Sequence, residues 1–265
     1  MPGMQWRVMR EAVSPHVSSL ALIPGLGSTA QLWSRVADQL GPEIELVVAE
    51  LPGHGDQAPA ARFTIELLAA QLLEALPVRT PQILVGHSMG GAIAMEMARS
   101  ARGRFAGLLL VCTSDRFGDE NGWRAHIDEV RSLGLALLAQ QASGGWFSAS
   151  FVKGNPRLVE DFVGGLMRVD EESYLACCAA LAQYDGRRRI SALDLPTVFI
   201  GAVEDEGTPS TNMNRMALNV KGARFVETAG SHLAPVESPA PIAVAIEQLV
   251  ALGMKSTAAR ERESS

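Results

Sequence analysis

The chain has 265 residues, of which 47% are hydrophobic and 20% are charged, and its net charge is −6. This length and hydrophobic content fit one α/β domain with an insertion, and the acidic balance without a basic stripe argues against a nucleic-acid partner. No apolar run reaches the roughly 18 residues of a membrane-spanning helix. The first residues lack the apolar core of a signal peptide, so we expect no membrane partner.

Apolar runs typical of strands alternate along the chain with segments of helical spacing. Up to residue 114 we expect strands over 16–25, 44–55 and 107–114 and helices over 32–41 and 64–76, the second with Thr64 as N-cap. Residues 82–98 are expected to form a strand, a turn and a helix. After residue 190 they are the strands 195–202 and 223–230 and the helix 241–253. This alternation predicts the α/β class, a mostly parallel twisted sheet with helices on both faces.

Residues 115–190 interrupt this pattern, because they show helical spacing with Gly and Ser breaks and no strand. We therefore expect a core formed by residues 1–114 and 191–254, with a helical cap over residues 115–190. Residues 255–265 are polar and lack periodicity, so we expect a disordered tail. The region before residue 16 is too short for us to assign a strand.

The turn within residues 82–98 has the sequence Gly-His-Ser-Met-Gly, in which Gly86 and Gly90 flank Ser88. This is the G-x-S-x-G pattern of a nucleophile elbow, in which a sharp turn between strand and helix exposes the serine hydroxyl. Side chains at the flanking positions would collide, and glycine has no Cβ. Ser88 is therefore the candidate nucleophile.

A serine hydroxyl needs a base, and the base needs an orienting carboxylate. After Ser88 the candidate bases are His126, which falls in a helical part of the cap, and His232, which follows the last predicted strand. In this arrangement the partners follow in the order Ser, acid, His, and a loop at the carboxyl edge of the sheet is the expected place for the base. We therefore predict that His232 is the base.

The acid is expected after the strand 195–202, in the sequence Val-Glu-Asp-Glu-Gly-Thr-Pro. Asp205 stands four residues before Pro209, which fits a D-x-x-T-P loop. Counting forward from the strand gives Glu204 instead, and Glu206 is a further neighbour. We predict Asp205 as the acid and the two glutamates as solvated loop charges.

Attack on a carbonyl creates an oxyanion, which needs preorganised donors. One donor is expected to be the backbone N–H of Met89, directly after the nucleophile. The other is expected to be the N–H of Leu26, in the Pro-Gly-Leu-Gly loop after the first predicted strand. Gly25 and Gly27 would let this loop approach the substrate closely, and Gly25 is a predicted substrate-binding residue.

Two further histidines lie near this machinery. His54, in a Gly-His-Gly turn, is expected to hold loop structure together through hydrogen bonds. His87 either lines the pocket or packs beneath the elbow. The five histidines of the chain are scattered without metal-ligand spacing, so we expect no metal and no cofactor.

The three cysteines, Cys112, Cys177 and Cys178, do not suggest a disulfide framework, since two of them are adjacent. Free thiols are typical of reducing compartments, and we expect a cytoplasmic protein.

These features resemble the α/β-hydrolase superfamily over nearly the whole chain, and the cap and the His232 loop resemble 3-oxoadipate enol-lactonases. The loop Ser-His-Leu followed by Glu-x-Pro fits that family, and so do the cap residues Trp123, Trp146, Phe147, Tyr174, Cys177, Cys178, Ala180 and Leu181. The resemblance implies the α/β-hydrolase fold with a small helical cap. We predict that Trp146 and Phe147 contact the substrate; the alternative is that they only pack the cap onto the core.

The chain departs from that family where positive charge is expected. Pro52 and Gly145 stand where enol-lactonases usually have arginines, and the loop at residues 24–27 reads Pro-Gly-Leu-Gly instead of Asn-Ser-Leu-Gly. A dicarboxylic substrate needs cations in the pocket. The cap still offers Arg124, Arg131, Lys153 and Arg168, which the sequence does not place.

The residues together predict a serine hydrolase that cleaves a small ester or enol-lactone through an acyl-enzyme, with a small molecule as its partner. The alternative is a carboxylesterase for methyl or aryl esters of lower charge. Two further alternatives on the same fold are a cofactor-free lyase and a non-catalytic scaffold. Release of an alcohol from a chromogenic ester would separate the hydrolase from both.

Overall fold

The computed structural model describes residues 3–13, 18–77 and 82–263. Within these residues one seven-stranded sheet has the order β1-β3-β2-β4-β5-β6-β7. Its strands are β1 Trp6–Arg10, β2 Ser19–Ile23, β3 Glu45–Ala49, β4 Gln82–His87, β5 Phe105–Val111, β6 Thr197–Ala202 and β7 Arg224–Thr228. β1 is antiparallel to β3, and the other neighbours are parallel. The predicted α/β class is confirmed.

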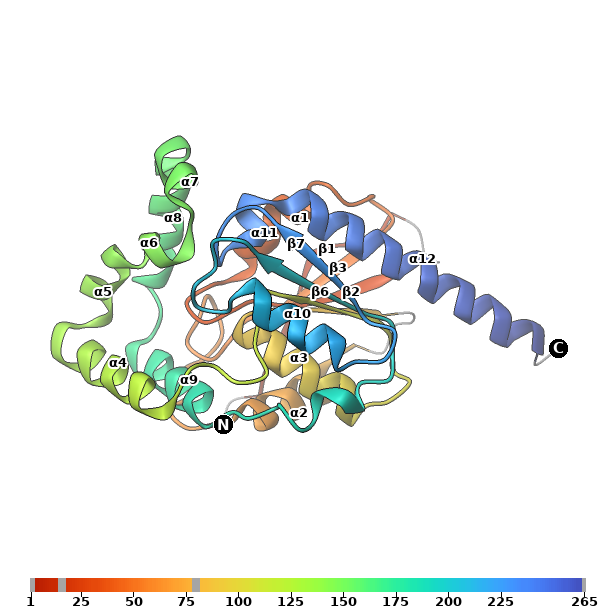
Figure 1. The fold of residues 1–265 in the computed structure, drawn as a ribbon, viewed down its shortest axis with the longest axis horizontal. Helices are drawn as coiled ribbons and strands as arrows, with labels where there is room; N and C mark the ends of the chain where they lie inside the picture. The colour runs from red at the N-terminus through yellow and green to blue at the C-terminus, as the bar shows by residue number, and fades with distance from the viewer. Residues whose placement is uncertain (1–2, 14–17, 78–81, 264–265) are drawn as a thin grey trace.

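Helices cover both faces of the sheet (Figure 1). One face carries η1 Ala30–Trp33, α1 Ser34–Ala37, α11 Ala234–Glu237 and α12 Pro239–Glu263. The other face carries α2 Ile65–Ala75, α3 Met89–Ser100 and α10 Ser210–Leu218, and a short η2 Ile190–Ala192 precedes β6. Thr64 caps α2 as predicted, because its side chain accepts a hydrogen bond from the Leu67 N–H.

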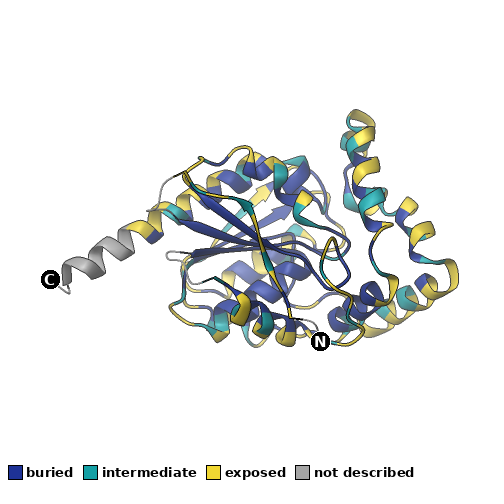
Figure 2. Ribbon diagram, turned by 180° about the vertical axis from the view of Figure 1, so that it is seen from behind, coloured by how far each residue is buried: buried dark blue, intermediate teal, exposed yellow. Residues whose placement is uncertain are grey.

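The sheet separates two hydrophobic cores, and β2 shows how the sequence builds both. Leu20 and Leu22 belong to the core under α1 and α12, whereas Ala21 and Ile23 belong to the core under α2 and α3. Successive side chains of a strand point to opposite faces, so a strand buried on both faces reads as a continuous apolar run. Figure 2 shows the central strands buried along their length and the outer sides of the helices exposed.

The cap contains α4 Glu120–Leu133, α5 Leu135–Gln141, α6 Ser143–Trp146, α7 Ala149–Gly154, α8 Pro156–Leu166 and α9 Glu171–Gln183. These helices follow β5 and precede β6, and Figure 1 shows them grouped at one end of the sheet. Asp119 and Asp170 begin α4 and α9, since their carboxylates accept backbone N–H hydrogen bonds of the first turn.

The structure differs from the sequence analysis at both ends of the chain. β1 lies in the region where we assigned no strand, and it forms the half-exposed edge beside β3. At the other end α12 continues to Glu263, through most of the segment 255–265 that we expected to be disordered, because its Ala, Arg and Glu residues favour helix without an apolar stripe. Residues 264–265, and residues 16–17 of the first predicted strand, lie outside the described residues.

The predicted helix over residues 32–41 is shorter than expected, since only η1 and α1 are helical there. Among the described residues, no helix combines the length and apolar character that crossing a bilayer requires.

Candidate active site

Ser88 lies at the turn between β4 and α3 with backbone angles of φ 52° and ψ −122°. A positive φ is strained for a residue with a Cβ, and such strain costs about 1–3 kcal/mol. Two hydrogen bonds hold the residue in place. The Ser88 N–H donates to the Val111 carbonyl at 3.0 Å, and the Thr113 hydroxyl donates to the Ser88 carbonyl at 2.6 Å.

The glycines around Ser88 permit close approach of backbone segments. A Cβ on Gly86 would collide with the backbone of Gly90 and Gly91, and a Cβ on Gly90 would collide with the Ile23 carbonyl. Backbone contacts of this kind cannot be relieved by moving a side chain. The turn predicted from the G-x-S-x-G pattern therefore depends on the absence of these side chains.

The side chains of Ser88, His232 and Asp205 form one hydrogen-bonded chain, although they come from three separate loops. His232 Nε2 lies 2.9 Å from Ser88 Oγ, and His232 Nδ1 lies 2.9 Å from Asp205 Oδ2. Because an ionised carboxylate only accepts hydrogen bonds, Nδ1 carries the proton and Nε2 accepts the Ser88 hydroxyl proton. This is the arrangement in which an imidazole acts as a base toward serine.

The Asp205 carboxylate is buried, whereas Glu204 and Glu206 on either side of it are exposed. Thr208 donates to Asp205 twice, through its N–H at 2.9 Å and its hydroxyl at 2.6 Å. Burial raises the pKa of the Asp205 carboxyl, but the electrostatic interaction with His232 and the hydrogen bonds from His232 and Thr208 outweigh burial and hold the pKa well below its ordinary value. The role of Thr208 was not assigned from the sequence, although the D-x-x-T-P motif signals it.

The predicted oxyanion donors lie on either side of Ser88. Met89 is the first residue of α3, and Leu26 lines the same cavity as Ser88. Among the described residues, neither backbone N–H has a hydrogen-bond partner. Gly25 approaches the elbow closely, since a Cβ there would lie 2.8 Å from the Ser88 Cβ.

His54 holds the Leu26 loop in place, as the sequence analysis expected of its turn. Its Nδ1–H donates to the Pro52 carbonyl at 2.9 Å, and its Nε2 accepts from the Gly27 N–H at 2.9 Å. Only the neutral ring can make both bonds. Burial lowers the pKa of His54 to about 4, although the Pro52 carbonyl and Asp170 act in the opposite direction.

His87 packs beneath the elbow, which decides between the two alternatives left open for it. It is buried, and its Nε2–H donates to the His232 carbonyl at 2.8 Å. Burial, together with the neighbouring His232, lowers the pKa of His87 to about 3. A neutral His87 therefore supports the backbone of the residue that bonds to Ser88.

The cap is hydrogen-bonded directly to the His232 loop. The Leu233 N–H donates to the Trp146 carbonyl at 2.9 Å. The Glu237 carboxylate accepts from the Ser231 N–H at 2.9 Å, from the Ser148 N–H at 3.0 Å and from the Ser148 hydroxyl. Glu237 thus joins the residue before His232 to the cap, a role that the Glu-x-Pro pattern alone did not reveal.

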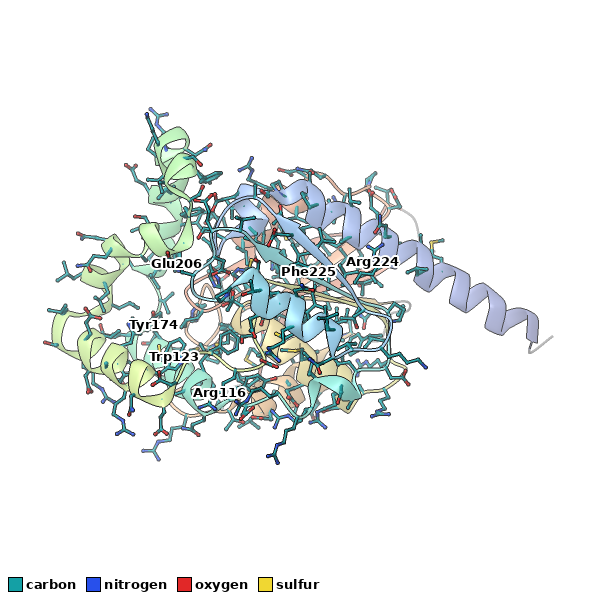
Figure 3. All side chains as sticks on the ribbon, viewed as in Figure 1. Arg116, Trp123, Tyr174, Glu206, Arg224 and Phe225 are labelled. Atoms are coloured by element: carbon teal, nitrogen blue, oxygen red, sulfur yellow. The ribbon has the colours of Figure 1, made fainter. Side chains whose placement is uncertain are left out.

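A cavity of about 470 Å³ opens onto Ser88 between the core and the cap. Its lining residues are Leu26, Ser88, Phe117, Gly118, Asp119, Gly122, Trp123, His126, Trp146, Tyr174, Leu181, Gly207, Thr208 and His232. An adjoining cavity of about 440 Å³ is lined by His232 without Ser88 and shares His126, Trp146 and Tyr174 with the first. Figure 3 shows Trp123, Tyr174 and Glu206 where the cap faces the core.

The charges around these cavities are negative. Asp119 lines the first cavity, and Glu129 and Glu206 line the second. Among the described lining residues of both cavities, none is Arg or Lys. Of the four cations named above, Arg124 and Arg131 are exposed and pair with Glu120 and Asp128 on their own helix.

Trp146 and Phe147 have different environments, which corrects the expectation that both contact substrate. Trp146 lines both cavities. Phe147 is buried outside the described lining of either cavity, stacked on Phe151 with ring centroids 5.2 Å apart and edge-on to Phe162. Phe147 therefore packs the cap onto the core, the alternative stated above.

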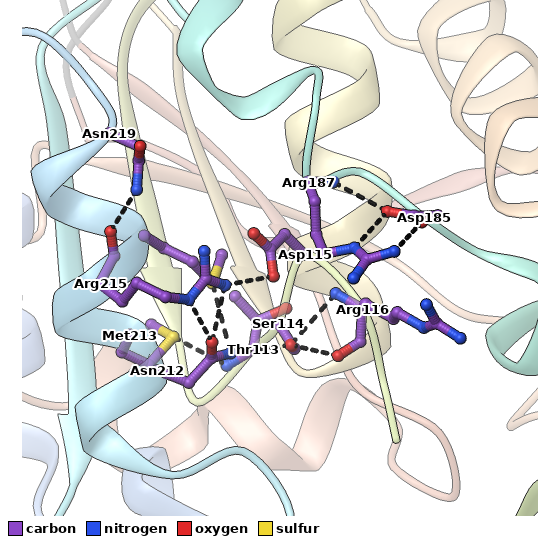
Figure 4. Close-up of polar contacts among 11 residues, drawn as sticks. Thr113, Ser114, Asp115, Arg116, Asp185, Arg187, Asn212, Met213, Arg215 and Asn219 are labelled. Carbon is purple, nitrogen blue, oxygen red and sulfur yellow. Dashed lines mark hydrogen bonds and ion pairs between the residues drawn. The ribbon is translucent and has the colours of Figure 1, made fainter. Parts of the chain in front are cut away.

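The N-terminal end of the cap is held against α10, which follows the Asp205 loop (Figure 4). Arg215 donates to Asp115 at 2.6 Å, and Asn212 donates to Ser114 at 2.9 Å. The Gly186 N–H donates to the Asp115 carbonyl at 2.7 Å, which brings the two ends of the cap together. The helix that follows the Asp205 loop is thus a second attachment point of the cap, besides the His232 loop.

Among the described residues, no cluster of three His, Cys, Asp or Glu side chains is arranged to hold a metal ion.

The sequence of the chain is similar to sequences of known hydrolases. Residues 20–245 match the alpha/beta hydrolase family. The chain is 25% identical to 3-oxoadipate enol-lactonase 2 of Acinetobacter baylyi over 228 residues, which are 85% of each chain. It is 30% identical over 233 residues to the pimeloyl-[acyl-carrier protein] methyl ester esterase of Vibrio vulnificus, covering 83% of this chain and 89% of that protein.

Among solved structures, the enol-lactonase from Burkholderia xenovorans LB400 superposes with a TM-score of 0.86, at 23% identity, over 94% of this chain and 96% of that one. At this identity the match supports the fold alone. The resemblance and the fold class predicted from the sequence are confirmed.

The packing at the elbow predicts a large effect of one methyl group. Gly90→Ala should destabilise the protein by about 3 kcal/mol, because the new Cβ meets the Ile23 carbonyl, and the melting temperature should fall by about 6–12 °C. Gly165→Ala in α8 is the control, since its Cβ meets nothing within 4 Å and alanine favours the helix. Equal melting temperatures for the two variants would contradict this account.

The two neutral histidines predict a decline of stability in mild acid. Below pH 6.5 His54 and His87 are protonated in the unfolded chain, whereas in the folded protein they stay neutral down to about pH 4 and pH 3. The free energy of unfolding therefore decreases as the pH is lowered from 7. Each should contribute about 2 kcal/mol of loss between pH 7 and pH 5.

Urea unfolding at the two pH values measures this loss. His54→Gln should reduce the decline by about 2 kcal/mol whatever its effect at pH 7. An unchanged decline would show that His54 is not held neutral in the folded protein.

Proposed function

The chain belongs to the alpha/beta hydrolase family, and from this premise we propose that it hydrolyses a small carboxylic ester or lactone through an acyl-enzyme. The observation that carries the proposal is the hydrogen-bonded chain from Asp205 through His232 to Ser88, with both separations at 2.9 Å. The opening of a cavity onto Ser88 supports access of a small molecule to this chain.

Ser88 Oγ attacks the ester carbonyl carbon while His232 Nε2 takes the hydroxyl proton. The tetrahedral intermediate then collapses, and the leaving alcohol takes that proton from His232. Water next gives a proton to His232 and attacks the acyl-serine, and the second tetrahedral intermediate collapses as Ser88 Oγ takes that proton from His232 and the acid is released. Asp205 orients the ring and stabilises the imidazolium form that appears twice in this cycle.

The backbone N–H groups of Leu26 and Met89 are proposed to bind the oxyanion. Their lack of other partners among the described residues supports this role. Each donor of this kind lowers the barrier by about 3 kcal/mol. His54 fixes the first donor indirectly, because it binds the N–H of Gly27, the next residue.

We further propose that residues 115–190 act as a cap that covers the bound substrate, with Trp146 as part of the cavity roof. The substrate is proposed to be uncharged around the scissile bond. The acidic lining and the absence of Arg and Lys among the described lining residues support this proposal. The 30% identity to a methyl ester esterase is compatible with such a substrate.

The identity of the acid is tested by substitution. Asp205→Asn should lower kcat for a chromogenic ester by about 10⁴-fold, since an amide in place of the carboxylate favours the wrong histidine tautomer. Glu204→Gln and Glu206→Gln are the matched controls, each expected to change kcat by less than about tenfold. If Glu204→Gln were the crippling change, Asp205 would not be the orienting acid.

The charge of the substrate gives a second test. We expect poor turnover of 3-oxoadipate enol-lactone and a higher kcat/KM for an uncharged ester. Gly145 lines the second cavity, and a Cβ there meets nothing within 4 Å, so Gly145→Arg adds a cation in open space. It should improve the dicarboxylate relative to the neutral ester by about 10- to 100-fold.

Gly145→Gln is the control for side-chain size without charge, and it should leave the ratio between the two substrates unchanged. A native kcat/KM of about 10⁶ M⁻¹s⁻¹ for the enol-lactone, typical of an efficient enzyme, would contradict the proposed uncharged substrate.

A further inference from the structure

His126 and Tyr174 form a polar pair in the wall of the cavity that contains Ser88. His126 lies on α4 and Tyr174 on α9, and His126 Nε2 is 3.0 Å from Tyr174 Oη. Both side chains line the first cavity and also the second. The mechanism proposed above uses neither of them.

The pair is uncharged at neutral pH. Burial lowers the pKa of His126, although Glu129 acts in the opposite direction, and burial raises the pKa of Tyr174. A neutral imidazole and a phenol carry one N–H and one O–H between them, and their mutual hydrogen bond uses one of these protons. The second proton is available to an acceptor on a ligand.

The other neighbours of the pair do not compete strongly for this proton. The Cys178 thiol lies beside the Tyr174 hydroxyl, and sulfur is a weak acceptor. The Glu129 carboxylate is 3.9 Å from His126 Nδ1, which is beyond hydrogen-bond distance. A ligand oxygen at this position would therefore be a better acceptor of this proton than either Cys178 or Glu129.

The charges around the pair favour a neutral oxygen over a carboxylate. Glu129 lies next to His126, and Asp119 lines the same cavity. A carboxylate of the substrate would be repelled by these two groups, whereas a keto or hydroxyl oxygen would not.

The two cavities indicate which part of the substrate reaches the pair. The acyl chain remains on Ser88 after the alcohol has left, so it occupies the cavity that Ser88 lines. The leaving group takes its proton from His232, which lines both cavities, and we assign the leaving group to the second cavity because Ser88 does not line it. The apolar side chains of Phe117, Trp123 and Leu181 line the same cavity as the pair and suit an acyl chain.

We propose that His126 and Tyr174 bind an uncharged oxygen, a ketone or a hydroxyl, on the acyl chain of the substrate at a distance from the scissile ester. The proposal rests on the proposed ester hydrolysis and narrows its substrate to oxo- or hydroxyacyl esters. Tyr174 and His126 are specificity-determining residues in this scheme, and Ser88 chemistry proceeds without them.

The test uses p-nitrophenyl esters in pairs of equal chain length, 4-oxopentanoate with pentanoate, 5-oxohexanoate with hexanoate, and 6-oxoheptanoate with heptanoate. We expect about a tenfold higher kcat/KM for the oxo ester of at least one pair. Tyr174→Phe should abolish that preference by raising KM for the oxo ester toward the value for the plain alkanoate.

Tyr184→Phe is the matched control. Tyr184 is also buried, but its hydroxyl donates to Glu96 at 3.2 Å and it lies outside the described lining of both cavities. This variant should retain the oxo preference even if its melting temperature falls. His126→Leu provides a second route to the same loss of preference if Tyr174→Phe does not fold.

Absence of an oxo preference at every chain length, or an equal loss on both members of each pair in Tyr174→Phe, would overturn this proposal while leaving ester hydrolysis intact. Absence of hydrolysis of every ester, plain and oxo alike, would overturn the proposed function and this proposal with it.

Discussion

The strained backbone of Ser88 is the constraint on which the rest of the site depends. Its positive φ projects the side chain from the end of β4, and the turn closes only because glycines allow β2, β4 and α3 to approach one another. The parallel neighbours of β4 end at the same edge of the sheet, so the loops that follow them surround Ser88. The cores on both faces of the sheet over-determine this geometry and offset its cost.

The parts of the site that local sequence determines were predictable. The elbow is one pentapeptide, and Asp205 is followed by the threonine that hydrogen-bonds to it, so local motifs pointed to both. The central strands were found because burial on both faces leaves continuous apolar runs, whereas the half-exposed edge strand β1 was not assigned. Glu204 remained an alternative to Asp205 because spacing along a loop does not determine which carboxylate is turned inward.

The parts that depend on long-range packing were not predictable. Trp146 and Phe147 are adjacent large aromatic residues, yet one lines the cavity and the other is stacked on Phe151. Glu237 binds Ser148 at a separation of 89 residues, and no periodicity records that contact. Contacts of this kind join the cap to the His232 loop. The same hydrogen bonds therefore hold both the cavity wall and the chain from Asp205 through His232 to Ser88 in place.

The central claim is that Ser88 becomes acylated during turnover. In the most direct measurement, the protein is mixed with p-nitrophenyl trimethylacetate, whose bulky acyl group slows attack by water. The reaction is then quenched in acid, and the acylated residue is located by peptide mass spectrometry. The account predicts a burst of about one equivalent of p-nitrophenol per protein and an acyl group on the peptide that contains Ser88. Steady release of p-nitrophenol without an acylated peptide, or acylation of a different residue, would contradict it.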